Sequence, residues 1–212
     1  MKTLEEHLKE SYAFHGENCP GQVIGTRMAI IGCESIGLDN PKSEDQRKKI
    51  IVYVEIDRCA TDAIMAVTGC RIGKKTLKIM DYGIMAATFV NLETNKAIRV
   101  LAREEARDLA PKYAPEIQEK YQQQREAYKV MPEEELFKIE EVKVEIPEED
   151  MPGKHLGRVQ CEKCDDYVQG HKEVKLNKKI LCQPCAYGGY FKREEFSALC
   201  QVKGKMNNIR KT

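Results

Sequence analysis

The chain has 212 residues, 42% of them hydrophobic, which is enough for one well-buried domain and a small appended module. Charged residues interrupt every hydrophobic stretch within a few positions, so the sequence excludes a membrane-spanning helix and predicts a soluble protein. Its nine cysteines could indicate a disulfide-bonded secreted protein, but residues 1–16 contain no apolar signal segment, and we therefore expect a reducing cytoplasm.

The N-terminal part of the sequence predicts helices around one buried strand. Apolar residues recur with helical spacing in three segments, whereas a fourth is rich in β-branched residues, as buried strands are. Pro20 suits the first turn of the second helix, and Gly69 suits the C-cap of the third. The predicted helices span residues 3–13, 20–37 and 59–69, and the predicted strand spans residues 49–58.

The next segments alternate strand and helix patterns. Pro111 and Pro115 interrupt a densely charged helical stretch over residues 103–129, which predicts a kink or two helices. Three strands before it are predicted to form an antiparallel meander, and one strand follows it. These strands span residues 76–81, 84–91, 97–101 and 137–147.

Residues 147–153 are acidic and contain proline and glycine, which is typical of a linker. Helices mixed with an antiparallel sheet in this order predict an α+β core domain over residues 1–152. A separate small domain is then expected over residues 153–212.

Two pairs of cysteines lie in this second domain. Cys161 and Cys164 form one pair, Cys182 and Cys185 form the other, and seventeen residues separate the pairs. Two residues between paired cysteines let one turn direct both thiolates to the same metal, and two pairs supply a closed tetrahedral shell. We therefore predict a structural zinc site with the cysteine spacing of a zinc ribbon, rather than unpaired thiols or disulfides, with no open position for a substrate.

Charge is distributed unevenly between the two predicted domains. From Gly153 onward there are thirteen basic and six acidic residues, a net charge of +7, and the remainder of the chain carries −6. Four thiolates with one zinc ion contribute about −2 more, which leaves the metal-loaded module near +5. Such a module can bind nucleic acid or an acidic protein surface, although a solvated lysine-rich loop fits the same composition.

Five side chains of the core domain could form a reactive or metal-binding site. Cys59 begins a predicted helix, where backbone N–H groups and the helix dipole are expected to lower its pKa. Asp62 lies on the same helix face and could ligate a metal, orient a ligand or simply cap the helix. The five candidates are His15, Cys19, Cys59, Asp62 and Cys70.

His15 and Cys19 are ligands of the kind that select zinc or another late transition metal, which makes a second metal site in the core conceivable. Free cysteines also pack as small hydrophobic residues, and this alternative suits Cys33 and Cys200 well and Cys70 moderately. The sequence around Cys59 does not match the nucleophile signature of papain-type proteases.

Four separated motifs carry a family resemblance. They are FHGENCPG at residues 14–21, VEIDRCATDA at 54–63, GCRIG at 69–73 and DYG at 81–83. In this order they resemble the E-subunit family of formylmethanofuran dehydrogenase, and the resemblance extends over most of residues 11–145. Some members of that family are similar in ending with a treble-clef zinc finger, which would place the first cysteine pair in a knuckle and the second at a helix start.

The resemblance implies an α+β core that forms an intertwined homodimer, with a pocket lined by the loop His and Cys and by the Cys-Asp helix start. The family takes its name from a complex that fixes carbon dioxide onto methanofuran, using a molybdenum or tungsten pterin held by other subunits. This chain has Glu17 where the family usually has a second histidine, and Ile84 where it often has a lysine. A glutamate can ligate zinc, whereas a missing lysine removes a cation for an anionic substrate, so metal binding is expected to persist better than catalysis.

Two functions of different classes follow. The first is a dimeric metal-binding protein that acts as an accessory subunit, or as a metal- and small-molecule-handling partner of redox-enzyme subunits, in one-carbon or molybdopterin metabolism. The second is a regulatory or adaptor protein whose basic zinc finger binds nucleic acid or a protein partner. An independent enzyme with Cys59 as its nucleophile is a third alternative.

Overall fold

The computed structural model describes residues 2–153 and 157–192. The chain divides into two units, residues 1–154 and 155–212. Each unit is described by itself. Within the described residues, the helices are too short or too polar to cross a membrane.

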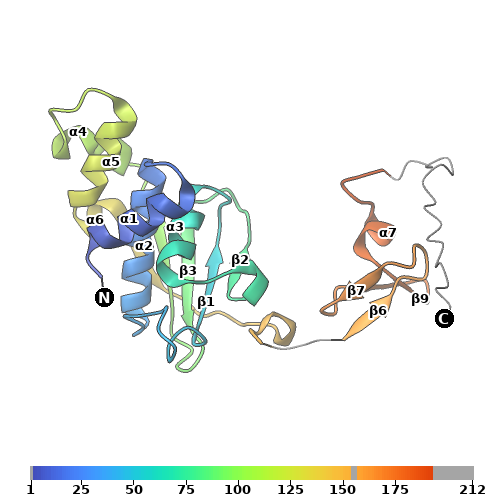
Figure 1. Ribbon diagram of the computed structural model, residues 1–212. Coiled ribbons are helices and arrows are strands. Elements are labelled where there is room, and N and C mark those ends of the chain that lie inside the picture. The colour runs from blue at the N-terminus through green and yellow to red at the C-terminus, as the bar shows by residue number, and fades with distance from the viewer. Residues whose placement is uncertain (1, 154–156, 193–212) are drawn as a thin grey trace, which may run out of the picture. The chain divides into compact units, whose positions relative to one another are not determined.

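The first unit contains helices and a single sheet, in an order that confirms the α+β class (Figure 1). Its helices are α1 (Leu4–His15), α2 (Pro20–Ser35), α3 (Cys59–Thr68), α4 (Ala106–Tyr113), α5 (Lys120–Val130) and α6 (Glu133–Leu136), with 3-10 turns η1 (Ile72–Lys74) and η2 (Glu148–Asp150). Its strands are β1 (Ile50–Val54), β2 (Leu77–Ile79), β3 (Ala86–Asn91), β4 (Ala97–Ala102) and β5 (Phe137–Glu141).

Helix α1 begins and ends with clear capping signals. The Thr3 side chain accepts a hydrogen bond from the Glu6 backbone, and the Glu6 carboxylate accepts one from the Thr3 backbone, which forms a capping box. Gly16 ends the helix with a φ of 90°, a left-handed conformation that favours glycine. The helix therefore extends two residues beyond the expected end and includes His15, which the sequence had placed in a loop.

The sheet has the strand order β2-β1-β3-β4-β5. Antiparallel pairs join β1 to β3, β3 to β4 and β4 to β5, but β1 and β2 are parallel. The expected meander is thus wrong at its first strand, because β2 pairs with β1 and not with β3. Helix α3 lies in the connection between these two parallel strands, as a crossover of this kind requires.

One face of the sheet is apolar and packs against the helices. Its inward side chains include Val52, Phe89 and Val100, all fully buried. Helix α2 approaches this face closely at Gly32, where a Cβ atom would lie 2.2 Å from the Phe89 ring. Helix α2 approaches α3 as closely at Gly25, where a Cβ would lie 2.4 Å from the Ala60 carbonyl oxygen. Because glycine has no Cβ atom, these two positions allow α2 to pack closely against both the sheet and α3.

The remaining segments of the first unit differ from expectation mainly in length. The predicted helical stretch is broken into α4 and α5, with Pro111 inside α4 and Pro115 in the break, so the expected interruption is confirmed. Strand β5 is shorter than expected and ends at Glu141. The chain after it packs Val142, Val144 and Ile146 onto the second face of the sheet.

Over its described residues, 157–192, the second unit contains two small hairpins and a short helix. Strands β6 (Arg158–Gln160) and β7 (Tyr167–Gln169) form one antiparallel pair, and β8 (Val174–Leu176) and β9 (Lys179–Leu181) form the other. Helix α7 (Gln183–Tyr187) follows directly. Its small core is built from Cys161, Leu181 and Cys182, with Val168 packed against them.

Candidate functional site

Three helices of the first unit bring one potential metal ligand each to a common point. His15 is the last residue of α1, Cys19 is the N-cap of α2, and Cys59 is the first residue of α3. One imidazole nitrogen and the two sulfur atoms all lie within 4.8 Å of one another, and all three residues are partly buried. Cys19 follows His15 by 4 positions and Cys59 follows Cys19 by 40, so the fold brings together residues that are distant in the sequence.

Asp62 orients the imidazole of His15. Its Oδ2 atom lies 2.8 Å from Nδ1 of His15. A carboxylate can only accept here, so Nδ1–H donates, and in the neutral imidazole this leaves the lone pair on Nε2. Metal-binding histidines commonly make this kind of hydrogen bond to a carboxylate, which fixes the ring orientation and raises the basicity of the ligand. Of the roles open to Asp62 from the sequence, the geometry favours orienting a ligand.

The electrostatic surroundings of Cys59 differ from the expectation based on its helix start. Burial raises the pKa of the Cys59 thiol, and the adjacent Cys19 thiol and the negative charge of Asp62 raise it further. The expected lowering of this pKa is therefore wrong, because burial and like charges outweigh the helix N-terminus. A thiol in these surroundings needs a cation to become a stable thiolate, which suits a metal ligand better than a free nucleophile.

Gln22 and Gly21 support the cluster, and the sequence analysis missed both. The fully buried Gln22 amide donates to the Cys59 carbonyl and accepts from the Ser11 hydroxyl, so it links α1, α2 and α3. At Gly21 a Cβ atom would lie 3.0 Å from Cβ of Cys59 and 3.8 Å from Sγ of Cys19. The sequence offered one signal for this role: Gln22 is a polar residue directly after Pro20 and Gly21, on the side of the helix that is buried.

Cys70 lies apart from this cluster, in the hydrophobic core. It is 1% exposed, and Cys33 is fully buried in the same core. Burial raises the pKa of both thiols, and the two cysteines lie close enough that Cys70 also influences Cys33. Both residues thus follow the alternative of a small hydrophobic residue, while Cys200 lies outside the described residues.

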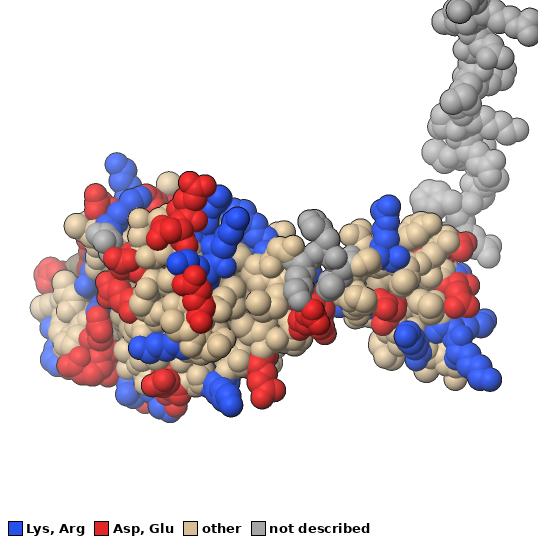
Figure 2. Space-filling model, turned by 90° about the horizontal axis from the view of Figure 1, so that it is seen from below, with Lys and Arg blue, Asp and Glu red and all other residues tan. Residues whose placement is uncertain are grey.

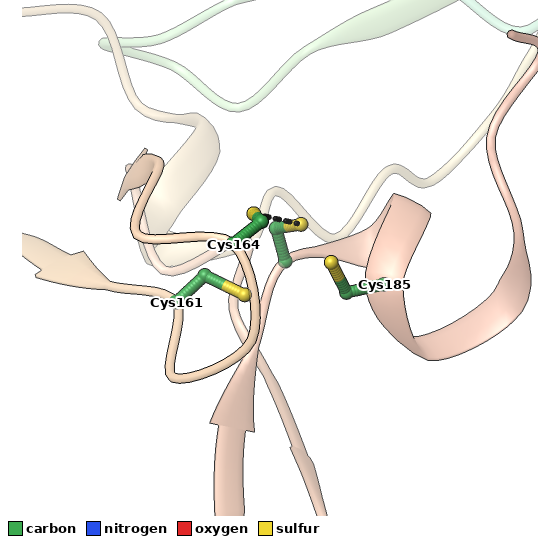
Figure 3. Close-up of side chains that lie close together, drawn as sticks. Cys161, Cys164 and Cys185 are labelled. Carbon is green, nitrogen blue, oxygen red and sulfur yellow. Dashed lines mark hydrogen bonds between the residues drawn. The ribbon is translucent and has the colours of Figure 1, made fainter. Parts of the chain in front are cut away.

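The four cysteines of the second unit form a second cluster. Their sulfur atoms lie within 4.8 Å of one another, and Figure 3 shows the sulfurs of Cys161, Cys164 and Cys185 around a common centre. The Cys164 and Cys182 sulfurs are 3.7 Å apart. Tetrahedral thiolates at zinc–sulfur distances of about 2.3 Å would be separated by about 3.8 Å. The cluster therefore has the size of a four-thiolate metal site.

Backbone amides and close sulfurs shape the protonation of this second cluster. Burial acts to raise the pKa of Cys161, but N–H groups of Cys182, Lys163 and Cys164 together lower it to about 6. The Asp166 N–H acts to lower the pKa of Cys164, but burial and neighbouring acidic groups raise it to about 12. The pKa values of the Cys161 and Cys164 thiols thus diverge, and a bound dication would take the place of protons on the cluster.

Comparison with known proteins gives a family match over most of the first unit. The family model FmdE, described as "FmdE, Molybdenum formylmethanofuran dehydrogenase operon", matches residues 14–147. This range includes every residue of the His15, Cys19 and Cys59 cluster, together with Asp62 and Cys70. The match agrees with the resemblance found in the sequence motifs.

A curated protein and a solved structure extend the comparison. A protein of Archaeoglobus fulgidus named "Probable S-adenosyl-L-methionine-binding protein" is 32% identical over 207 residues, which cover 89% of this chain and 54% of the relative. The chain thus spans about half the length of that protein. The crystal structure of a tungsten formylmethanofuran dehydrogenase FmdE-like protein from Syntrophus aciditrophicus shares the fold, with a TM-score of 0.61, 19% identity, and coverage of 90% of this chain and 96% of that one.

Proposed function

The chain belongs to the FmdE family, and from this premise we propose that it is a metal-handling accessory protein of one-carbon or molybdopterin redox metabolism. The observation that carries the proposal is the convergence of His15, Cys19 and Cys59 at the ends of three helices. Asp62 holds the imidazole in the tautomer that a metal requires. A cluster built in this way supports metal binding more directly than it supports nucleophilic catalysis.

The ligand set indicates both the kind of metal and the way it would be used. Two thiolates and one imidazole are typical ligands of zinc and other late transition metals. Three protein ligands leave a fourth position for water or a small molecule, as in sites that bind substrates. When bound, the metal would act as a Lewis acid or as an anchor for a small ligand. His15 Nε2 and the sulfurs of Cys19 and Cys59 would hold it.

The name of the Archaeoglobus relative suggests a first small molecule to test. That protein is named as a probable S-adenosyl-L-methionine-binding protein. We propose S-adenosyl-L-methionine as a candidate ligand of this chain, bound beside the core cluster. Calorimetric titration of the full chain before and after loading with zinc would show whether it binds and whether binding requires the metal.

For the second unit we propose a structural zinc in a treble clef. Cys161 and Cys164 lie in the turn after β6, and Cys182 and Cys185 lie at the start of α7, after the β8–β9 hairpin. A knuckle, a hairpin and a helix start in this order support the treble clef. Four thiolates close the coordination shell, so this metal would stabilise the fold and would not contact a substrate.

We further propose that the first unit forms a homodimer and contacts redox-enzyme subunits. An apolar segment from the last residue of β2 through the loop before β3 supports a protein interface. Its exposed side chains are Ile79 at 44%, Met80 at 42%, Tyr82 at 62% and Ile84 at 39% exposure. Exposed apolar groups clustered in this way are typical of a contact surface. Sedimentation of the full chain would test the dimer.

Metal analysis of the purified full chain tests the leading proposal. We expect about two equivalents of zinc per chain, one in each cluster. The double variant C19S/C59S should retain about one equivalent, because the four-thiolate site is untouched. The variant Cys33→Ala, which changes a buried cysteine outside both clusters, should retain both. One equivalent in the unchanged chain that C19S/C59S also retains would show that the core cluster does not hold a metal.

A second candidate is a regulatory or adaptor protein whose basic finger binds nucleic acid or a protein partner. It is favoured by the net charge of +7 over residues 153–212 and by exposed aromatic rings on the finger. The rings are Tyr167 at 62%, Tyr187 at 75% and Tyr190 at 100% exposure. Binding of nucleic acid to the full chain should then weaken steeply as salt rises.

A further inference from the structure

The β6–β7 hairpin has one continuous outer face. The strands pair Val159 with Val168 and Gln160 with Tyr167. Side chains alternate along a strand, so both valines lie on the opposite face from Gln160 and Tyr167. The two valines are partly buried, and Val168 packs against the cysteine core of the finger. The residues of the outer face are Arg158, Gln160, Tyr167 and Gln169, and all four are exposed.

An aromatic ring and a guanidinium group occupy this outer face together. The Tyr167 ring is 62% exposed, and the Arg158 guanidinium carbon lies 5.7 Å from the ring centre. Two amide side chains flank the pair and can donate to and accept from a ligand. A flat ring, a stacking cation and hydrogen-bonding amides are the groups with which proteins hold unstacked bases.

The surroundings of the outer face favour an anionic partner. Its own side chains carry a positive charge and no negative one. Residues 157–192 contain seven basic and four acidic residues, and the charge of about −2 from a zinc ion with four thiolates leaves the finger near +1. Lys178 in the turn between β8 and β9 and Lys179 at the start of β9 are exposed on the same unit. Figure 2 shows basic side chains on this unit together with a smaller number of acidic ones. The combination suits a phosphodiester chain better than a neutral surface.

We propose that the outer face of the β6–β7 hairpin binds single-stranded nucleic acid, a proposal that rests on the second candidate function. A duplex hides the faces of its bases, whereas a single strand can stack a base on Tyr167 and place phosphates near Arg158. Strands of three residues span about 10 Å, so the face accommodates roughly two or three nucleotides. Binding is therefore sequence-tolerant and weak for a short strand. RNA and single-stranded DNA share the chemistry that this face recognises.

Fluorescence anisotropy with the zinc-loaded full chain tests this site. The probes are a labelled ten-nucleotide RNA, the DNA strand of the same sequence, and the corresponding DNA duplex, each at several salt concentrations. We expect the single strands to bind and the duplex to bind more weakly. Stronger binding of the RNA than of the DNA strand would point to contacts with the 2′-hydroxyl.

Variants of the outer face locate the binding. Tyr167→Ala should weaken binding about tenfold or more, and Tyr167→Phe should preserve it, because the ring stacks and the hydroxyl does not. Arg158→Gln should weaken binding and should reduce the slope of log affinity against log salt concentration by about one, which corresponds to one phosphate contact. The matched control is Tyr121→Ala on α5, where an equally exposed tyrosine, at 66%, lies in the other unit. Unchanged zinc content shows that each variant is folded.

The possible results separate this proposal from the function on which it rests. Binding to the duplex but not to single strands would overturn the single-strand site and leave a nucleic-acid function standing. Binding that Tyr167→Ala does not change would place the site elsewhere and would also overturn the proposal. Absence of binding to any probe at low salt would contradict both the single-strand site and the nucleic-acid function, and would leave a protein as the partner of the finger.

Discussion

Asp62→Ala is expected to weaken metal binding at the core cluster while leaving the fold intact. The Asp62 carboxylate lies 2.8 Å from Nδ1 of His15 and is 38% exposed, so its main contact is with the imidazole. Loss of a carboxylate that orients a metal-binding histidine typically costs 10- to 100-fold in affinity, about 1.4–2.7 kcal/mol. The metal affinity of Asp62→Asn should lie between those of the unchanged chain and Asp62→Ala, because the Asn amide oxygen still accepts a hydrogen bond but carries no charge.

A chelator competition measures this effect in the full chain. The four-thiolate site is saturated first, and the affinity of the second zinc equivalent is then read from competition with a chromogenic chelator. Asp57→Asn serves as the control, because Asp57 is an exposed carboxylate only two residues before Cys59. An Asp62→Ala protein with the affinity of the unchanged chain would refute the orienting role, as would an equal loss in Asp57→Asn.

Three further predictions concern stability. Gly32→Ala should lower the free energy of unfolding in urea by about 1–3 kcal/mol, because the added Cβ would lie 2.2 Å from the Phe89 ring; an unchanged unfolding midpoint would contradict the close approach. His7 is buried, neither ring nitrogen has a hydrogen-bond partner among the described residues, and burial lowers its pKa. The pKa of His7 is therefore lower in the folded than in the unfolded chain, so the free energy of unfolding should fall as pH drops below about 6.5, by at most about 1.4 kcal/mol per pH unit. The variant His7→Leu should flatten this pH dependence, which thermal melts at about pH 5 to 8 would measure. Removal of zinc by a chelator should unfold the finger, seen as faster amide exchange of Leu181, while exchange in the first unit stays slow.

Local sequence patterns predicted most elements of the first unit but not all of their pairings. Strand β3 and strand β4 are rich in apolar residues and joined by a short turn, so their hairpin followed from the sequence. Strand β2 has only three residues, and its partner depends on where the crossover through α3 returns the chain. That choice is made by packing across the sheet, which no local pattern records.

The candidate site likewise has features that the local sequence predicts and features that depend on tertiary contacts. The spacing of the four C-terminal cysteines is local, and it predicted their cluster directly. The convergence of His15 with Cys59 depends on tertiary contacts between α1 and α3, among them the Gln22 amide that links Ser11 to the Cys59 carbonyl, and only the folded chain reveals these contacts. The expected pKa of Cys59 was wrong for the same reason, since the helix start is local but burial and the Cys19 neighbour are not.

X-ray absorption at the zinc edge tests the central claim most directly, because it counts the atoms bound to the metal. In the full chain loaded with zinc, a four-sulfur site and a site with two sulfurs, His15 and one light ligand should average about three sulfurs at about 2.3 Å and one nitrogen or oxygen at about 2.0–2.1 Å. The C19S/C59S variant should shift this average to about four sulfurs. An average of four sulfurs in the unchanged chain would contradict a metal at His15, Cys19 and Cys59.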